Sequence, residues 1–217
     1  MSQIEGLIRM VNEKKGENPK KRQARIITVA SGKGGVGKSN ISVNIAISYA
    51  RLGKKVLLMD ADLGLANVNI LLGVIPKYTL YDVIKGEKNI EEILIPYRDN
   101  IWIIPGASGF YQVAELKADQ RKFLVSNLEY LDNFEIIIVD AGAGISNNVL
   151  SFIASSNEVL VVTTPEPTAL TDAYGMIKAV VSQSADAQVK LITNMIRNVQ
   201  QGKKVYQKLS EVCQRFL

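Results

Sequence analysis

The sequence predicts an α/β fold in which a doubly wound, mostly parallel sheet carries helices on both of its faces. Three observations indicate this fold. From Arg25 onward, short apolar runs alternate with helical patterns, the runs contain no polar alternation, and a glycine-rich turn follows the first run. Runs that are apolar throughout are typical of parallel strands covered on both faces. Their regular alternation with helices is typical of doubly wound sheets.

The individual elements follow in chain order. Apolar runs predict strands at Ile26–Ala30, Lys55–Met59, Ile101–Ile104, Glu135–Val139, Val159–Thr163 and Val189–Thr193. Apolar residues at helical spacing predict helices at Lys38–Leu52, Gln112–Leu131, Asn147–Ala154 and Thr168–Ser182. A last helix begins near Lys203 and nothing follows to terminate it, so we expect the chain to be truncated at Leu217.

A chain of 217 residues is long enough for one α/β domain, and a second full domain is not expected. We divide the chain into an amphipathic helix at residues 1–13, a basic linker at 14–24 and the α/β domain at 25–217. The helix carries an apolar stripe at Ile4, Leu7, Ile8 and Val11. A helix this short is marginal alone, so we expect it to dock on its own domain or on a partner.

The net charge of +5 is concentrated in and beside the linker, at Lys14, Lys15, Lys20, Lys21, Arg22 and Arg25. A solvated linker accounts for these residues, and an arm that touches anionic lipid or nucleic acid is the alternative. The chain has one cysteine, Cys213, and no histidine. A disulfide framework, a cysteine zinc site and histidine-dependent triads are therefore excluded within one chain. No apolar run approaches the ~20 residues of a membrane span, and we expect no signal peptide.

The stretch Gly32–Ser39, GKGGVGKS, matches the P-loop pattern G-x-x-x-x-G-K-[ST] and lies between a predicted strand and a predicted helix. Its backbone N–H groups can point inward at a bound phosphate, and the positive N-terminal end of the following helix also favours an anion there. Lys38 then bridges the β- and γ-phosphates and the Ser39 hydroxyl binds Mg²⁺. The nucleotide-binding residues predicted here are Gly34, Gly35, Val36, Gly37, Lys38, Ser39 and Asn40.

Carboxylates follow two further strands, where nucleotide chemistry in such sheets is located. Asp60 and Asp62 end the run beginning at Lys55, and Asp140 ends the run beginning at Glu135. An aspartate at a strand end is often only a cap or a turn residue. Because these aspartates lie downstream of a P-loop, we expect them to complete a magnesium and water site.

A second lysine in the glycine-rich loop, Lys33, gives the sequence KGGVGKS, the signature of the deviant Walker A ATPases. This family includes the division-site protein MinD and the DNA-partitioning ParA proteins. The strings DADLGLANVNILLG at Asp60–Gly73, DAGAGIS at Asp140–Ser146 and TTPEPTALTDAYGMIK at Thr163–Lys178 most closely resemble the flagellar-number regulators called FlhG, YlxH or FleN. The resemblance covers residues 25–217.

This resemblance implies roles for individual residues. Lys33 matches the lysine that reaches across an ATP-sandwich dimer to the partner's phosphates, whereas Lys38 serves its own nucleotide. Asp62 matches the residue that orients the attacking water, so the resemblance implies that Lys33, Lys38 and Asp62 are catalytic. Asn194 matches the asparagine that reads the adenine edge. We expect ATP rather than GTP, because the chain lacks an obvious Asn-Lys-x-Asp guanine motif.

The resemblance also implies cofactors and partners. Mg²⁺ would be held by Ser39, Asp60 and Asp140, with ATP as the substrate and ADP as a product of slow, dimer-dependent hydrolysis. The expected partners are a second copy of the chain when ATP is bound, the flagellar GTPase FlhF and other flagellar assembly or regulatory proteins. The family members end in a membrane-targeting helix that this chain lacks. The implied location is the cytoplasm, peripheral to the inner face of the cell membrane in the full-length, ATP-bound protein.

Two alternatives depart from this interpretation. A ParA-like DNA-partitioning ATPase would bind DNA nonspecifically through the basic linker, but the string at Thr163–Lys178 favours the flagellar branch, and we do not expect DNA binding. An iron–sulfur carrier on this fold needs clustered cysteines, which one cysteine excludes. In the flagellar branch the first helix usually carries an Asp-Gln-Ala…Leu-Arg motif that stimulates FlhF. Here Gln3, Leu7 and Arg9 echo that motif, with Ser2 in place of the acid.

Overall fold

The structure is a computed structural model that describes residues 24–98, 100–107, 116–131, 133–183 and 187–217. Seven strands form one sheet in the order β3-β4-β2-β5-β1-β6-β7, and every neighbouring pair is parallel except β3 and β4. The strands are β1 (Arg25–Ser31), β2 (Val56–Ala61), β3 (Ile95–Pro96), β4 (Ile101–Ile104), β5 (Ile136–Ala143), β6 (Glu158–Thr163) and β7 (Val189–Thr193).

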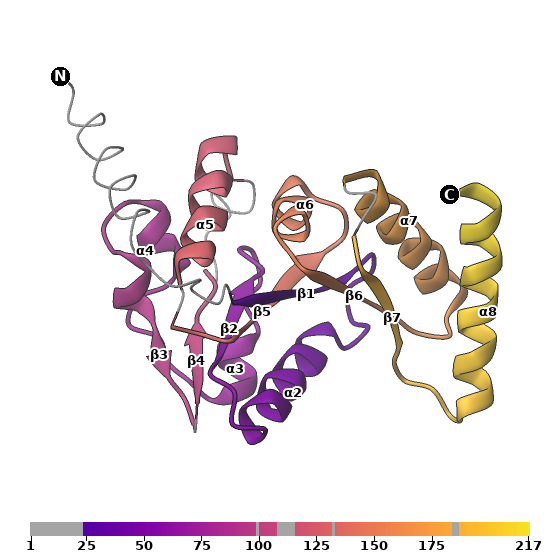
Figure 1. Cartoon of the computed structure of the whole chain (residues 1–217), viewed down its shortest axis with the longest axis horizontal. Helices are drawn as coiled ribbons and strands as arrows, with labels where there is room; N and C mark the ends of the chain where they lie inside the picture. Colours follow the sequence, from indigo (N-terminus) through magenta and orange to yellow (C-terminus); the bar gives the residue numbers. More distant parts are fainter. Residues whose placement is uncertain (1–23, 99, 108–115, 132, 184–186) are drawn as a thin grey trace, which may run out of the picture.

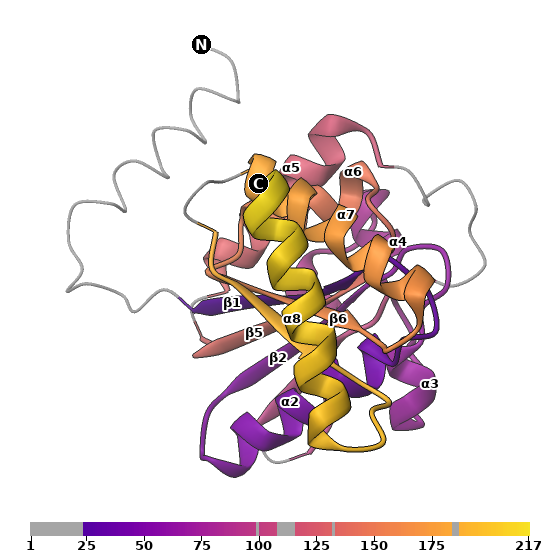
Figure 2. The same cartoon turned by 90° about the vertical axis from the view of Figure 1, so that its right-hand side faces the viewer.

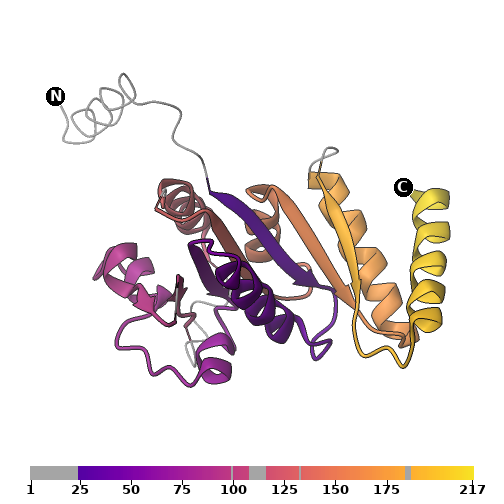
Figure 3. The same cartoon turned by 60° about the horizontal axis from the view of Figure 1, so that its bottom comes forward.

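Helices cover both faces of this sheet, as Figures 1 and 3 show. The helices α2 and α3 lie on one face, α4, α5, α6 and α7 lie on the other, and α8 runs beside β7 at the edge (Figure 2). Their bounds are α2 (Lys38–Arg51), α3 (Val68–Leu72), α4 (Leu80–Ile84), the 3-10 helix η1 (Ile90–Ile93), α5 (Ala118–Tyr130), α6 (Asn147–Ala154), α7 (Pro167–Gln183) and α8 (Val199–Phe216). The predicted doubly wound α/β fold is therefore confirmed.

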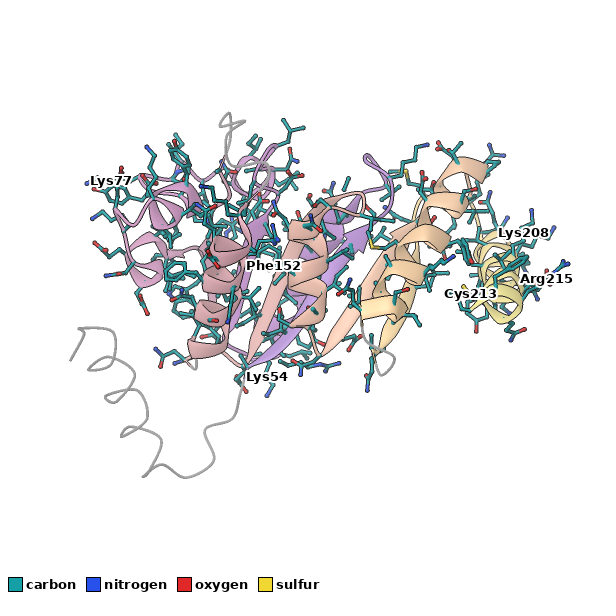
Figure 4. The ribbon with its side chains drawn as sticks, turned by 90° about the horizontal axis from the view of Figure 1, so that it is seen from above. Lys54, Lys77, Phe152, Lys208, Cys213 and Arg215 are labelled. Atoms are coloured by element: carbon teal, nitrogen blue, oxygen red, sulfur yellow. The ribbon has the colours of Figure 1, made fainter. Side chains whose placement is uncertain are left out.

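The core consists of two apolar layers, one on each face of the sheet. In β5, Ile137 packs in the layer under α5 whereas its neighbour Ile138 packs in the layer under α2. Phe152 of α6 joins the first layer and is labelled between α5 and α6 in Figure 4. Successive side chains of a strand point to opposite faces, so a strand covered on both sides has to be apolar throughout.

The structure corrects several predicted boundaries and adds four short elements. The helix predicted at Gln112–Leu131 begins at Ala118, because the Gln120 side chain accepts a bond of 3.0 Å from the backbone N–H of Lys117 and caps the helix there. The last helix begins at Val199 rather than near Lys203. The added elements β3, α3, α4 and η1 have two to five residues each, which is too short to show a period. The predicted helix at 1–13 and the linker up to residue 23 lie outside the described residues.

The edge helix α8 is amphipathic. Gly202, Val205 and Leu209 are buried against the sheet and α7. Lys208 and Arg215 project away from the sheet, as the labels in Figure 4 show. Within the described part of the chain, no helix is both long enough and apolar enough to span a bilayer.

Replacing Ile138, which is fully buried in the central strand, tests the two-layer core. Ile138→Ala leaves a cavity in the layer under α2 and should lower the free energy of unfolding by about 2–5 kcal/mol. Leu52→Ala, at a site that is 74% exposed, should change it by less than about 0.5 kcal/mol. Urea unfolding of both variants measures the difference. Equal effects would contradict the packing described here.

Candidate functional site

The carboxyl ends of β1, β2, β5, β6 and β7 lie along one edge of the sheet. The connection after β1 runs to α2 on one face, whereas the connection after its neighbour β5 runs to α6 on the other. Ligands of doubly wound sheets bind at such a switch point, outside the carboxyl ends of the strands. The predicted P-loop is the connection that leaves β1 at this point.

The P-loop backbone needs its glycines. Gly35 and Gly37 have φ angles of 77° and 89°, in the left-handed region that side chains other than glycine rarely adopt. Gly37 is the N-cap residue of α2, and no side chain caps the helix there. The first backbone N–H groups of α2 therefore point out of the helix without a side-chain acceptor, at the end where the helix dipole favours an anion.

Lys38 lies inside the site and contacts a carboxylate. Its Nζ atom is 3.3 Å from Asp140 Oδ1, and the Lys38 residue is 9% exposed. Ser42, one turn further along α2, donates to the same oxygen at 2.9 Å. The second oxygen, Asp140 Oδ2, is buried and has no hydrogen-bond partner among the described residues. A buried carboxylate oxygen without a donor is a position that a cation can occupy.

Lys33 lies in a different environment. Its Nζ atom donates to Glu166 Oε2 at 2.6 Å and to Thr168 Oγ1 at 3.0 Å, and its side chain is 37% exposed. Glu166 precedes α7, and Thr168 lies in the first turn of that helix. The two lysines of the loop therefore have separate partners: Lys38 faces the sheet, and Lys33 faces the start of α7.

Two further contacts fix the P-loop. A Cβ atom on Gly32 would lie 2.2 Å from the backbone oxygen of Asp172, so only glycine allows the loop to pass so close to α7. On the other side, Asn194 Nδ2 donates to the Val36 carbonyl at 2.9 Å. The side chain of Val36 is buried in the layer under α2. Asn194, which follows β7, thus contacts the P-loop, and its predicted role in reading adenine stays a prediction.

Asp60 is fully buried and holds the loop that follows β2. Its Oδ1 accepts from the Asp62 backbone at 3.1 Å, and its Oδ2 accepts from the backbones of Asn67 and Val68 at 2.8 and 2.9 Å. Asp60 and Asp140 are partners in the parallel register of β2 and β5. Burial, together with the negative charge of Asp140, raises the pKa of Asp60 to about 7. The structure therefore gives Asp60 a loop-holding role, and its predicted role as a metal ligand stays a prediction.

Asp62 lies beside the last residues of β5. Its carboxylate carbon is 3.7 Å from the position of a Cβ atom on Gly142. Asp62 Oδ1 accepts from the backbones of Gly64 and Leu65 at 3.2 and 3.0 Å, in a turn of the kind that aspartate forms readily. Three of the predicted site residues, Asp60, Asp62 and Asp140, thus lie together.

The predicted magnesium site has only three protein ligands: Ser39, Asp60 and Asp140. Among the described residues, no group of three or more Asp, Glu, Cys or His side chains forms a metal site. Ser39 is half-buried in the first turn of α2. Mg²⁺ in nucleotide sites is held by one or two protein groups together with phosphates and waters, so a small protein set fits this ion.

Comparison with known proteins assigns the family. A family model described as an AAA domain matches residues 24–204. The antiactivator FleN of Pseudomonas aeruginosa is 42% identical over 194 residues, which cover 89% of this chain and 69% of FleN. The flagellum site-determining protein YlxH of Helicobacter pylori is 38% identical over 203 residues, which cover 91% of this chain and 68% of YlxH. The chain belongs to the FleN and YlxH branch of the MinD-type ATPases.

Solved structures agree with this assignment. The cell division ATPase MinD of Pyrococcus furiosus has a TM-score of 0.74 and 30% identity, over 86% of this chain and 80% of that one. MinD of Pyrococcus horikoshii, complexed with Mg-ADP, has a TM-score of 0.74 and 29% identity, over 86% and 77%. A plasmid partition protein of Borrelia burgdorferi, at 22% identity and a TM-score of 0.71, shares the fold alone. Both the fold and the family predicted from the sequence are confirmed.

Sequence reasoning missed several residues of this site. Ser42 could have been found, since it lies four residues after Lys38 and therefore on the same face of α2. Glu166, Thr168 and Asp172 lie in the string at Thr163–Lys178 that carries the family resemblance. Nothing local predicts their contact with the P-loop, because they reach it from more than 130 residues away. Only the arrangement of α7 beside β1 brings them there.

Asp60→Asn should change how stability depends on pH. In the folded wild type Asp60 keeps its proton up to about pH 7, whereas in the unfolded chain it loses the proton near its ordinary value of 3.8. The folded state therefore binds more protons between these values, and stability falls as pH rises through this window. Asp60→Asn removes that contribution and should flatten the fall.

Urea unfolding at a series of pH values measures this slope. The matched control Asp119→Asn removes an exposed carboxylate from α5 and should keep the wild-type slope. If the slope of Asp60→Asn equals that of the wild type, the buried carboxyl is not the cause.

Proposed function

We propose that this chain is an ATP-dependent dimerising switch that regulates flagellar number and placement, with slow, Mg²⁺-dependent hydrolysis of ATP to ADP and phosphate. The observation that carries the proposal is the different placement of the two P-loop lysines. Lys38 is directed inward to Asp140, and Lys33 lies at the surface on Glu166. An inward lysine suits the chain's own phosphates, and a surface lysine is available to a second copy.

In this proposal the P-loop backbone from Gly34 to Gly37 and the first turn of α2, including Asn40, bind the phosphates. Lys38 leaves Asp140 to contact the β- and γ-phosphates. Ser39 and Asp140 would hold Mg²⁺, and the unpartnered Oδ2 of Asp140 supports this. Held there, Mg²⁺ would offset the negative charge that develops during phosphoryl transfer. MinD of Pyrococcus horikoshii is complexed with Mg-ADP, which supports Mg²⁺ and ADP as ligands of this chain.

Asn194 is proposed to select the base. Its Nδ2 donates to the Val36 carbonyl, so the amide is oriented with Oδ1 as the free acceptor. Adenine presents an amino donor at the position where guanine presents a carbonyl oxygen. An acceptor oriented in this way favours ATP over GTP.

The proposed dimer forms at the carboxyl edge of the sheet. Three different loops there each present a large exposed apolar side chain: Leu65 at 75%, Met195 at 61% and Ile145 at 47% exposed. Exposed apolar groups around a polar site are typical of a surface that is covered on association. In the dimer Lys33 exchanges Glu166 for the partner's phosphates, and Asp62 orients the water that attacks the γ-phosphorus as the bond to ADP breaks.

The proposal extends to location and partners by family membership. FleN is named an antiactivator and YlxH a flagellum site-determining protein. We therefore propose the flagellar GTPase FlhF and other flagellar proteins as partners. We propose a cytoplasmic location, peripheral to the membrane when ATP is bound. The domain division into a helix at 1–13, a linker and an ATPase domain at 25–217 is part of this proposal. DNA partitioning is not favoured, because the partition protein compared above shares only the fold.

Single substitutions of the two lysines should separate their roles. Lys38→Ala should weaken nucleotide binding by the monomer. Lys33→Ala should bind nucleotide but lose ATP-dependent dimerisation, and its hydrolysis rate should fall by roughly 10³–10⁵, the worth of a cation supplied in trans. Asp62→Ala should dimerise and accumulate with ATP bound.

Size-exclusion chromatography with ATP and with ADP measures dimerisation, and calorimetric titration measures binding. Lys203→Ala, which removes an exposed lysine of α8, is the control and should match the wild type in both. If Lys33→Ala dimerises as readily as Asp62→Ala, the cross-dimer role of Lys33 is wrong.

Asn194→Ala should reduce the preference for the adenine base. Losing one hydrogen bond costs about 1 kcal/mol, so the ratio of ADP to GDP affinity should fall roughly fivefold. Calorimetric titration with both nucleotides measures the ratio. The control Gln200→Ala, at an exposed position, should leave it unchanged. A ratio that is the same in Asn194→Ala as in the wild type would contradict base reading by Asn194.

A further inference from the structure

A second pocket lies at the amino edge of the sheet, opposite the candidate nucleotide site. It has a volume of about 330 Å³ and an apolar floor formed by Leu94, Trp102, Leu131 and Phe134. The rings of Trp102 and Phe134 meet edge to face at 5.5 Å. Lys55, Glu91 and Asn133, all exposed, form its rim. An apolar floor with a polar rim is typical of a binding pocket, and nothing in the proposed ATPase mechanism uses it.

The chain enters the domain directly beside this pocket. The Arg25 backbone N–H bonds to the Glu135 carbonyl at 2.9 Å, and the Glu135 N–H bonds to the carbonyl of Lys55 at 2.9 Å. Glu135 follows Phe134 of the floor, and Lys54, which precedes Lys55, marks this end of the sheet in Figure 4. Ala24 is half-buried against the apolar cluster that contains Leu131 and Phe134, and Leu94 and Trp102 pack against the same cluster. Whatever precedes Ala24 therefore starts next to the pocket.

We propose that the apolar stripe of residues 4–11 docks in this pocket within the same chain. Ile4, Leu7, Ile8 and Val11 have the i, i+3, i+4, i+7 spacing of a helix that lies in an apolar groove. The stripe is flanked by charges of both signs, as is the rim of the pocket. The inference is independent of the nucleotide site.

The length of the intervening segment supports docking in the same chain. Residues 12–23 separate the stripe from Ala24. A chain of this length has a root-mean-square span of about 20 Å, enough to return to a pocket beside its own end. A short tether of this kind gives an effective concentration on the order of millimolar. Even a weak contact between the stripe and the floor is then occupied much of the time.

Trp102 is the only tryptophan of the chain, so its fluorescence reports on the pocket directly. In the full chain, docking shields the indole from water. Leu7→Asp places a charge in the stripe and should shift the emission of Trp102 to longer wavelength and make its quenching by acrylamide steeper. The matched control Asn12→Asp adds the same charge outside the stripe and should behave like the wild type. Equal quenching in all three proteins would overturn the proposal.

A distance measurement tests whether docking occurs in the same chain. A Ser2→Cys, Cys213→Ser variant labelled with dansyl at position 2 should show energy transfer from Trp102 that does not depend on protein concentration. Adding Leu7→Asp should lower this transfer to the value that the tether alone gives. Transfer that rises with concentration would assign the pocket to a second copy, and transfer equal to that of the Leu7→Asp variant would show that the stripe does not dock in the pocket. Either result would contradict docking within the chain.

Discussion

Asp140 is a carboxylate that is 1% exposed within the central strand β5, and a buried charge of this kind destabilises the fold unless donors meet it. Lys38 and Ser42 supply those donors, at 3.3 and 2.9 Å. Because these two residues lie one turn apart on α2, they fix the rotation of that helix against the sheet. The P-loop connects β1, which is fixed in the sheet, to α2, which is fixed by these contacts. The positions of these two elements therefore constrain the conformation of the loop. The rest of the candidate site is arranged around that loop.

The register partner of Asp140 constrains the other side of the site. Asp60 is surrounded by backbone donors rather than side chains, so it holds the path of residues 62–68. The chain after β4 closes over it, since a Cβ atom on Gly106 would lie 2.9 Å from the Asp60 carbonyl oxygen. Two aspartates in register on neighbouring strands thus have different roles: Asp140 orients a helix, and Asp60 shapes the loop that carries Asp62.

Local patterns predicted the fold well because buried parallel strands must be apolar on both faces. The runs at β1, β4 and β7 have nearly the predicted bounds, whereas the start of α5 depends on the Gln120 cap, which a period does not show. In the site, the P-loop was predictable because it follows a strand. The aspartates were predictable because they lie near strand ends, although β2 and β5 extend past the predicted bounds and contain Asp60 and Asp140. The partners of Lys33 were not, because the contact with Glu166 depends on how α7 crosses the end of β1. Asp60 shows a further limit of prediction from sequence. The sequence indicates where this carboxylate lies but not that three backbone N–H groups donate to it.

The two P-loop lysines, Lys38 and Lys33, also differ in the free energy needed to break their contacts with Asp140 and Glu166. Removing Lys38 from Asp140 without a replacement cation leaves a buried carboxylate with only the Ser42 donor, so this movement is favourable only when another positive charge arrives. The contact of Lys33 with Glu166 is exposed, and Glu166 is 64% exposed, so water and salt compete with it. A lysine held by a weak, surface contact can move to another anion at little cost, while the rest of the loop stays fixed by Gly32, Val36 and Lys38. Lys33 is therefore the more easily released of the two loop lysines, which is the property that the proposed switch requires.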